Sequence, residues 1–392
     1  MEEKMKIDLS NIPVIDNHCH PFVLGREPEV FAKNFCIGLY PVSEENMKST
    51  IYYQQVINAL RKFFNLPETA TEEEVVALRN KYAQEDRVNY AHKLFESQNI
   101  KGFLCDFGFP ISQITNPENK LTDSEIKEYR DACEGYTDIY NIDRIEWVAN
   151  RIVEEEPSFD EFESRLVKDT KKLVQEKNLI ALKSVVAYYT GLDVRPLSRD
   201  EFKKGYYLYL YDPDNWEYRK MFHDFIFIKA CEICRELDIP LQVHTGLGDT
   251  PHCHIVRVNP ANLTDALNDP RVMGTTIVLI HGGYPYCEEL GMLVNHFEHV
   301  YCDCSSFIPF AGIAAYDKLK ALLELCPTKK LFFGTDAGLI LEGLWFGTMN
   351  FKKVYARILE ELIDDGYITY EFAMQSAEDI LYNNVKRVYK LK

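Results

Sequence analysis

Short apolar runs that end in a polar residue recur along this chain of 392 residues, and they constrain its fold more than any other feature. Helical patterns follow most of these runs, and one of them predicts a helix over 216–237. Alternation of strands and helices favours parallel strands, because each helix returns the chain to the same edge of the sheet. Eight such units in a chain of this length predict an α/β fold, a (β/α)8 barrel of the TIM type. We expect strands near 13–18, 100–106, 142–148, 179–187, 239–244, 276–281, 300–304 and 331–336.

The interval between the first and the second predicted strand is longer than the others. Residues 22–99 have mostly helical patterns, and Thr71 with Glu74 three residues later has the spacing of a capping box. An ordinary connection between a strand and a helix is much shorter. We therefore predict a helical insertion at 22–99, after the first strand. No linker, repeat or low-complexity segment divides the chain, so residues 1–392 are expected to form a single barrel domain.

The amino-acid composition indicates which classes of binding partner are unfavourable for this protein. The formal net charge of −17 argues against binding to a nucleic-acid backbone or an anionic membrane. No run of eighteen apolar residues occurs, and the polar start has no apolar signal segment. The eleven cysteines lie mostly within strand or helix patterns, as is typical of free thiols in a reducing compartment. We expect a cytoplasmic protein that acts on a small molecule, and a homo-oligomer is compatible with the sequence.

Four histidines and an aspartate stand at predicted strand ends: His18 and His20 at the first, His244 at the fifth, His281 at the sixth and Asp336 at the eighth. The carboxyl ends of all strands meet on one face of a parallel barrel, so these side chains should converge. We predict a divalent metal, preferably zinc, bound by His18, His20, His244 and Asp336. Such a site leaves a position for water. Asp336 could take the proton of that water, and His281 could orient the water or polarise the substrate.

These residues also carry a family resemblance. His18-Cys-His20, His244, His281 and Thr335-Asp336 resemble the amidohydrolase superfamily over nearly the whole chain. Segments 182–192, 242–249 and 280–285 are similar to a branch of amidohydrolase family 2 that includes domains fused to glutamine-synthetase-like domains. The resemblance implies the same metal ligands and the same catalytic pair. It implies a metal-dependent hydrolase that cleaves a C–N (amide) bond of a small, carboxylated substrate. The alternative within this family is a zinc-dependent decarboxylase.

The resemblance does not determine the role of Lys183. Other amidohydrolases carry a carboxylated lysine on the fourth strand, where it bridges two metals. An unmodified Lys183 would instead bind a substrate carboxylate or pair inside the barrel, for example with Asp16 or Asp106, since a lysine in an apolar run needs a partner. Lys183 precedes the predicted strand end by several residues. We therefore prefer an ordinary ammonium and one metal, and expect two metals if Lys183 is carboxylated.

Several further residues are predicted to contact substrate because they follow strand ends or match the family branch. Arg257 is a candidate anchor for a substrate carboxylate, and a surface arginine is the competing interpretation. The others lie in the loops after the fourth, fifth and eighth strands: Tyr188, His252, His254, Glu342 and Trp345.

Overall fold

The computed structural model describes residues 6–22, 31–36, 42–108, 122–249, 253–338 and 340–392. Its eight strands form one sheet in chain order, and each neighbouring pair is parallel. The predicted (β/α)8 barrel is confirmed. The strands are β1 (Val14–Cys19), β2 (Ile100–Asp106), β3 (Asp138–Arg144), β4 (Leu179–Ser184), β5 (Leu241–His244), β6 (Ile277–Ile280), β7 (Val300–Asp303) and β8 (Leu331–Phe332).

Backbone hydrogen bonds between β1 and the segment after β8 bring the two ends of the sheet together. The amide of Asn17 donates to the carbonyl of Phe333 at 2.9 Å, and the amide of Asp336 donates to the carbonyl of His18 at 2.8 Å. The amide of His20 then donates to the carbonyl of Ala337 at 2.7 Å. These bonds place Asp336 directly beside the two histidines of β1, although more than 300 residues separate them in sequence.

The third strand begins and ends earlier than predicted. We expected a strand at 142–148, but β3 ends at Arg144 and the helix α6 begins at Ile145. In this helix Ile145, Val148, Ala149 and Ile152 are buried. Their spacing of three and four residues is that of one helix face, which explains why this apolar run is not a strand.

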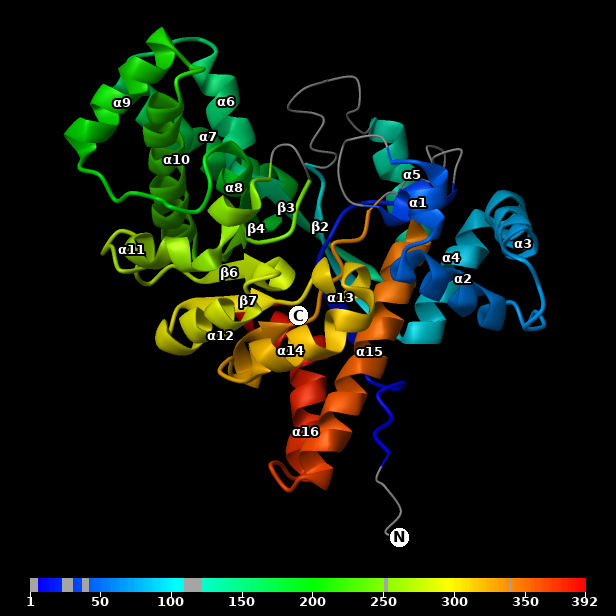
Figure 1. The fold of residues 1–392 in the computed structure, drawn as a ribbon. Helices are drawn as coiled ribbons and strands as arrows, with labels where there is room; N and C mark the ends of the chain where they lie inside the picture. The colour runs from blue at the N-terminus through cyan, green and yellow to red at the C-terminus, as the bar shows by residue number, and fades with distance from the viewer. Residues whose placement is uncertain (1–5, 23–30, 37–41, 109–121, 250–252, 339) are drawn as a thin grey trace.

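Helices surround the barrel on its outside (Figure 1). The helix predicted over 216–237 is α10. Those outside the predicted insertion are α5 (Asp123–Cys133), α6 (Ile145–Val153), α7 (Phe159–Lys177), α8 (Val186–Tyr189), α9 (Arg199–Tyr211), α10 (Trp216–Leu237), α11 (Thr264–Leu267), α12 (Cys287–His296), α13 (Phe307–Phe310), α14 (Ala315–Leu323), α15 (Leu341–Asp364), α16 (Tyr370–Glu378) and α17 (Asn384–Val388). Shorter helical turns are η4 (Ile255–Val258), η5 (Pro260–Leu263), η6 (His281–Gly283), η7 (Gly312–Ala314), η8 (Thr328–Lys330) and η9 (Asp379–Asn383).

Within the predicted insertion 22–99, the described residues are mostly helical. Thr71 and Glu74 form the expected capping box at the start of α3. Figure 1 shows these helices together on one side of the barrel, beside α15. They are η1 (Phe31–Phe35), α1 (Glu44–Lys48), α2 (Ile51–Phe63), α3 (Glu72–Glu85) and α4 (Arg87–Gln98).

The C-terminal segment packs against the core of the barrel. Val385 and Tyr389 pack in one cluster with buried side chains of the strands, among them Ile15, Leu104 and Phe332. All eleven cysteines are free thiols, as expected. Among the residues that the structure describes, no helix has both the length and the apolarity that a membrane crossing requires.

Candidate active site

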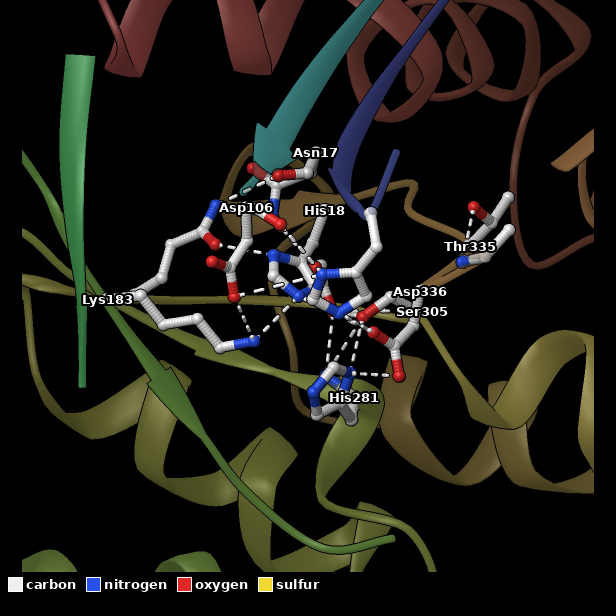
Figure 2. A network of polar contacts seen from close by, with 12 residues as sticks. Asn17, His18, Asp106, Lys183, His281, Ser305, Thr335 and Asp336 are labelled. Carbon is white, nitrogen blue, oxygen red and sulfur yellow. Dashed lines mark hydrogen bonds and ion pairs between the residues drawn. The ribbon is translucent and has the colours of Figure 1, made fainter. Parts of the chain in front are cut away.

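The polar strand ends converge at the carboxyl face of the barrel (Figure 2). The Nε2 atoms of His18 and His20 lie 3.5 and 3.1 Å from Oδ1 of Asp336. Nδ1 of His281 lies 3.7 Å from the other carboxylate oxygen. The ligand atoms of His18, His281 and Asp336 all lie within 4.8 Å of one another, and so do those of His18, His20 and Asp106. Both groups have the spacing that a shared metal ion needs.

The second ring nitrogen of each β1 histidine has a fixed partner. Nδ1 of His18 donates to Oε1 of Gln242 at 2.8 Å, and Nδ1 of His20 donates to the carbonyl of Asp106 at 3.0 Å. Gln242 is held in turn by Tyr389, whose hydroxyl lies 2.9 Å from Nε2 of the glutamine. A proton on Nδ1 leaves the lone pair on Nε2, so both rings present an unprotonated nitrogen toward Asp336.

His244, at the end of β5, has a buried Nε2 with no hydrogen-bond partner among the described residues. Its ring centroid lies 4.4 Å from that of His281 and 4.5 Å from that of Tyr188. Gly248 approaches closely, because a Cβ atom there would lie 2.7 Å from Nε2 of His244. A buried nitrogen without a partner is costly unless something binds it, and a metal ion would fit.

His281 and Asp336 are held in unusual backbone conformations. Their φ angles are 73° and 56°, in the left-handed region. The amide of His281 donates to Oδ1 of Asp303 at 2.8 Å, and its Nδ1 donates to the hydroxyl of Ser305 at 2.8 Å. Ser305 itself donates to the same Asp303 oxygen. Such strain persists where surrounding contacts determine the conformation, and it is concentrated at functional sites.

Burial sets the protonation of the cluster. It lowers the pKa of His18 to about 4, with Lys183 acting in the same direction. Burial also holds the pKa values of His244 and His281 well below their usual range. For Asp336, burial favours the protonated form, but the neighbouring histidines hold its pKa well below normal. Neutral imidazoles around a carboxylate are the protonation states that metal binding requires.

Lys183 reaches the site from β4. Its Nζ donates to Nε2 of His18 at 2.9 Å and lies 3.2 Å from Oδ2 of Asp106. The same oxygen accepts from Nε and Nη2 of Arg144, at 2.9 and 2.8 Å. Of the two partners considered inside the barrel, Asp106 is therefore the observed one. Asp16 instead accepts from the backbone amides of Thr335 and His18.

A pocket opens above the cluster. Its cavity volume is about 130 Å³, and it opens to solvent. Three basic side chains line it together with aromatic and acidic groups. Among its lining residues are Lys33, Arg144, Lys183, Tyr52, Tyr188, Phe310, Asp249, His20, His244, His281 and Asp336.

Of the predicted substrate contacts, Tyr188 lines this pocket, whereas Arg257, Glu342, Trp345 and His254 are not among its lining residues. The guanidinium of Arg257 stacks 4.0 Å above the ring of Trp216, and His254 is exposed. Nε1 of Trp345 donates to Ser97 at 2.9 Å. Glu342 accepts from Arg79 and Tyr90. The roles of these four residues as substrate contacts stay predictions, and His252 lies outside the described residues.

Several side chains that support the site were not predicted from the sequence. Arg144 was hidden because the predicted strand 142–148 placed it inside a strand instead of at its end. Asp303 ends β7 and was available as a strand-end signal. Gln242 and Ser305 carry no comparable signal, since their role depends on contacts with His18 and His281.

Comparisons with known proteins agree with this fold. A family model described as amidohydrolase matches residues 207–391. Protein fluG of Emericella nidulans is 30% identical over 251 residues, which cover 60% of this chain and 28% of that protein. The chain thus spans little more than a quarter of the length of this curated relative.

Two solved structures show the same fold. A Lactobacillus casei protein named as a metal-dependent hydrolase has a TM-score of 0.82 at 22% identity, with 98% of both chains covered. A uronate isomerase of Bacillus halodurans has a TM-score of 0.63 at 13% identity, covering 98% of this chain and 94% of that one. The chain thus has the fold of these two proteins, and its residues 207–391 are similar to the amidohydrolase family.

Proposed function

We propose that this protein is a metal-dependent hydrolase that cleaves a C–N (amide) bond of a small, carboxylated substrate. His18, His20, His244 and Asp336 hold one divalent ion, preferably zinc. The observation that carries this proposal is the orientation of the β1 histidines. Their Nδ1 atoms are occupied by Gln242 and Asp106, while both Nε2 atoms point at Oδ1 of Asp336. The unpartnered Nε2 of His244 supplies the third nitrogen.

A bound ion of this kind lowers the pKa of water toward neutrality and so makes hydroxide available at pH 7. Asp336 takes the proton from the water and later donates it to the leaving nitrogen. Its low pKa keeps it ionised at neutral pH. His281, fixed by Ser305 and Asp303, orients the water or polarises the substrate carbonyl.

We propose that Lys183 acts as an unmodified lysine. Its contact with Asp106, at 3.2 Å, is the contact of an ammonium with a carboxylate. A carboxylated Lys183 would carry a negative charge and would be repelled by that same aspartate. One ion therefore follows from this pairing, and a second ion would require Lys183 to be modified.

The chemistry of the rest of the chain supports a small-molecule enzyme in the cytoplasm. The net charge of −17 opposes nucleic-acid binding, and the free thiols suit a reducing compartment. Protein purified without chelator and incubated with a panel of amides of small carboxylic acids should release amine. Release of carbon dioxide without amine would replace the hydrolase proposal by the decarboxylase alternative.

The metal assignment is tested by elemental analysis of protein purified without chelator. Native protein should contain about one equivalent of a divalent ion, because the ligand set forms one four-ligand site. The double variant His18→Ala, His20→Ala should lose it. The matched control is His254→Ala, His296→Ala, two exposed histidines outside the site. Unchanged metal in the first variant would reject the proposed ligands.

A further inference from the structure

Arg144 stands at the carboxyl end of β3 and lines the pocket, although it was not predicted as a site residue. The side chain is almost fully buried, with 2% of the residue exposed. Its Nε and Nη2 both donate to Oδ2 of Asp106. Its Nη1 is buried and has no hydrogen-bond partner among the described residues. A residue that lines the pocket therefore has one buried charged donor without an acceptor among the described residues.

The position of this donor is well determined. Asp106, which holds two of the three guanidinium nitrogens, also accepts from the amide of Gly108 at 2.8 Å and from Lys183 at 3.2 Å. The guanidinium is thus oriented before any ligand arrives. A buried charged N–H group without an acceptor costs more free energy than a neutral one, so this geometry favours a ligand that accepts from Nη1.

A second unpartnered donor lies nearby. Nε1 of Trp147, three residues along the chain, is also buried without a partner among the described residues. A Cβ atom at Gly108 would lie 2.8 Å from this Nε1 and 2.9 Å from Nε of Arg144. Both side chains therefore lie against the same glycine, and a larger residue there would displace them. Of the two, only Arg144 belongs to a residue that lines the pocket, so Arg144 is the candidate for an anion there.

We propose that Nη1 of Arg144 binds a carboxylate of the substrate. This inference rests on the proposed function and names the group that the site recognises. Asp106 offsets one of the two positive charges of Arg144 and Lys183. The net charge that remains suits a monoanionic carboxylate better than a phosphate dianion. Arg257, which was expected in this role, stacks on Trp216 instead.

The same contacts locate the carboxylate relative to the reacting bond. Asp106 bridges Arg144 and Lys183 through one oxygen, and Nζ of Lys183 lies 2.9 Å from Nε2 of His18. A carboxylate bound to Arg144 would thus be separated from His18 only by the side chains of Asp106 and Lys183. The substrate carboxylate must then stand only a few bonds from the carbon that reacts.

The test compares two probes of similar size that differ in a single charge, succinate and butyrate. Each can place one carboxylate at the metal, and only succinate has a second carboxylate for Arg144. Dissociation constants are measured by ligand-observed NMR on protein as purified, with inorganic phosphate as a third probe. Wild-type protein should bind succinate about tenfold or more tightly than butyrate, as a charge-assisted hydrogen bond implies.

Three variants complete the experiment. In Arg144→Met the preference for succinate should fall to about twofold or less, and in Arg257→Met it should stay at the wild-type value. Arg144→Lys can still pair with Asp106 and should remain folded, yet it lacks Nη1 and should also lose the preference. If a folded Arg144→Lys keeps the preference, or if wild-type protein has none, the inference is wrong. Tighter binding of phosphate than of succinate, lost in Arg144→Lys, would overturn the choice of carboxylate.

Failure of this inference can be distinguished from failure of the proposed function. Metal content and amine release are measured on the same samples. If the protein binds metal and hydrolyses amides, but its preference for succinate does not depend on Arg144, only this inference is wrong. An Arg144-dependent preference in a protein that binds no metal would reject only the proposed hydrolase.

Discussion

Each histidine of this site has polar atoms that the surrounding residues either hold in place or leave without a partner. His281 illustrates the point, because its Nδ1 and its amide are both held by the Ser305 and Asp303 pair. The ring cannot turn without breaking these bonds. His244 has no such support at Nε2, which leaves that atom available to a ligand.

This difference predicts opposite results for two matched variants. His281→Asn should lower turnover by about 100-fold and leave the metal content unchanged, as expected for loss of a group that acts in general acid–base chemistry. His244→Asn should lower the metal content. Both are measured by amine release and elemental analysis on the same samples. Loss of metal in His281→Asn would instead make His281 a ligand, and near wild-type turnover would remove it from the mechanism.

Glu146 provides a prediction of pH dependence. Burial raises the pKa of this carboxyl to about 7, although Ser184 and the amide of Val185 donate to it. A raised pKa means that the fold favours the protonated form. The stability that this form contributes is fully present below the unfolded pKa, near 4.5, and is lost as the pH rises through 7.

Glu146→Gln should therefore remove part of the decrease in stability between pH 5 and pH 8. The expected gain relative to wild type at pH 8 is about 3 kcal/mol, since each unit of pKa shift corresponds to about 1.4 kcal/mol. Urea unfolding at both pH values measures it. The exposed Glu85→Gln is the control and should leave the pH profile unchanged. An unaltered profile in Glu146→Gln would show that this group does not titrate differently in the fold.

At the scale of elements, Glu342 connects the last long helix to the helices inserted after β1. It is fully buried at the start of α15 and accepts from Arg79 of α3 and from Tyr90 of α4. Three helices from opposite ends of the chain thus meet at one carboxylate. Trp345, one turn later, adds a hydrogen bond to Ser97 in α4.

Replacing Glu342 by Gln leaves Arg79 buried opposite a neutral group. We expect a loss of about 3–5 kcal/mol, as is typical when one partner of a buried ion pair is removed. Glu361→Gln, on the same helix, breaks only a surface pair with Lys320 and should cost less than about 1 kcal/mol. Thermal unfolding measures both, and hydrogen exchange should show faster opening of 72–98 in the first variant. Equal losses in the two variants would contradict the proposed connection.

At the scale of the whole molecule, a shared metal should stabilise the barrel, because its proposed ligands come from β1, β5 and the segment after β8. Ion present at about a thousandfold above its dissociation constant would add about 4 kcal/mol. Removal of the ion by a chelator should therefore lower the melting temperature, and added zinc should restore it. The double variant His18→Ala, His20→Ala should show no such response. A chelator effect of equal size in that variant would assign it to another site.

The stoichiometry of the metal tests Lys183 in the same samples. Lys183→Ala should lower activity or stability while the metal content stays near one equivalent. A native value of two that falls to one in this variant, and recovers with bicarbonate and a short carboxylic acid, would show that Lys183 is carboxylated.

Sequence pattern alone was sufficient for the fold class. Apolar runs separated by helical periodicity are local features, and a (β/α)8 barrel repeats one local unit eight times. The helix 216–237 was predicted from periodicity and matches α10. The strand predicted at 142–148 was misplaced, because its apolar residues fit either period over so short a stretch.

The sequence by itself determined which polar residues stand at strand ends, because strand ends follow from the local pattern. Only the tertiary structure decided what each of them meets. Closure of the barrel by Asn17 and Phe333 places Asp336 against His18 and His20. The same packing turns Arg257 onto Trp216 and brings Arg144 to the pocket. Contacts between residues that are distant in sequence depend on the twist and closure of the whole sheet, which no local pattern records.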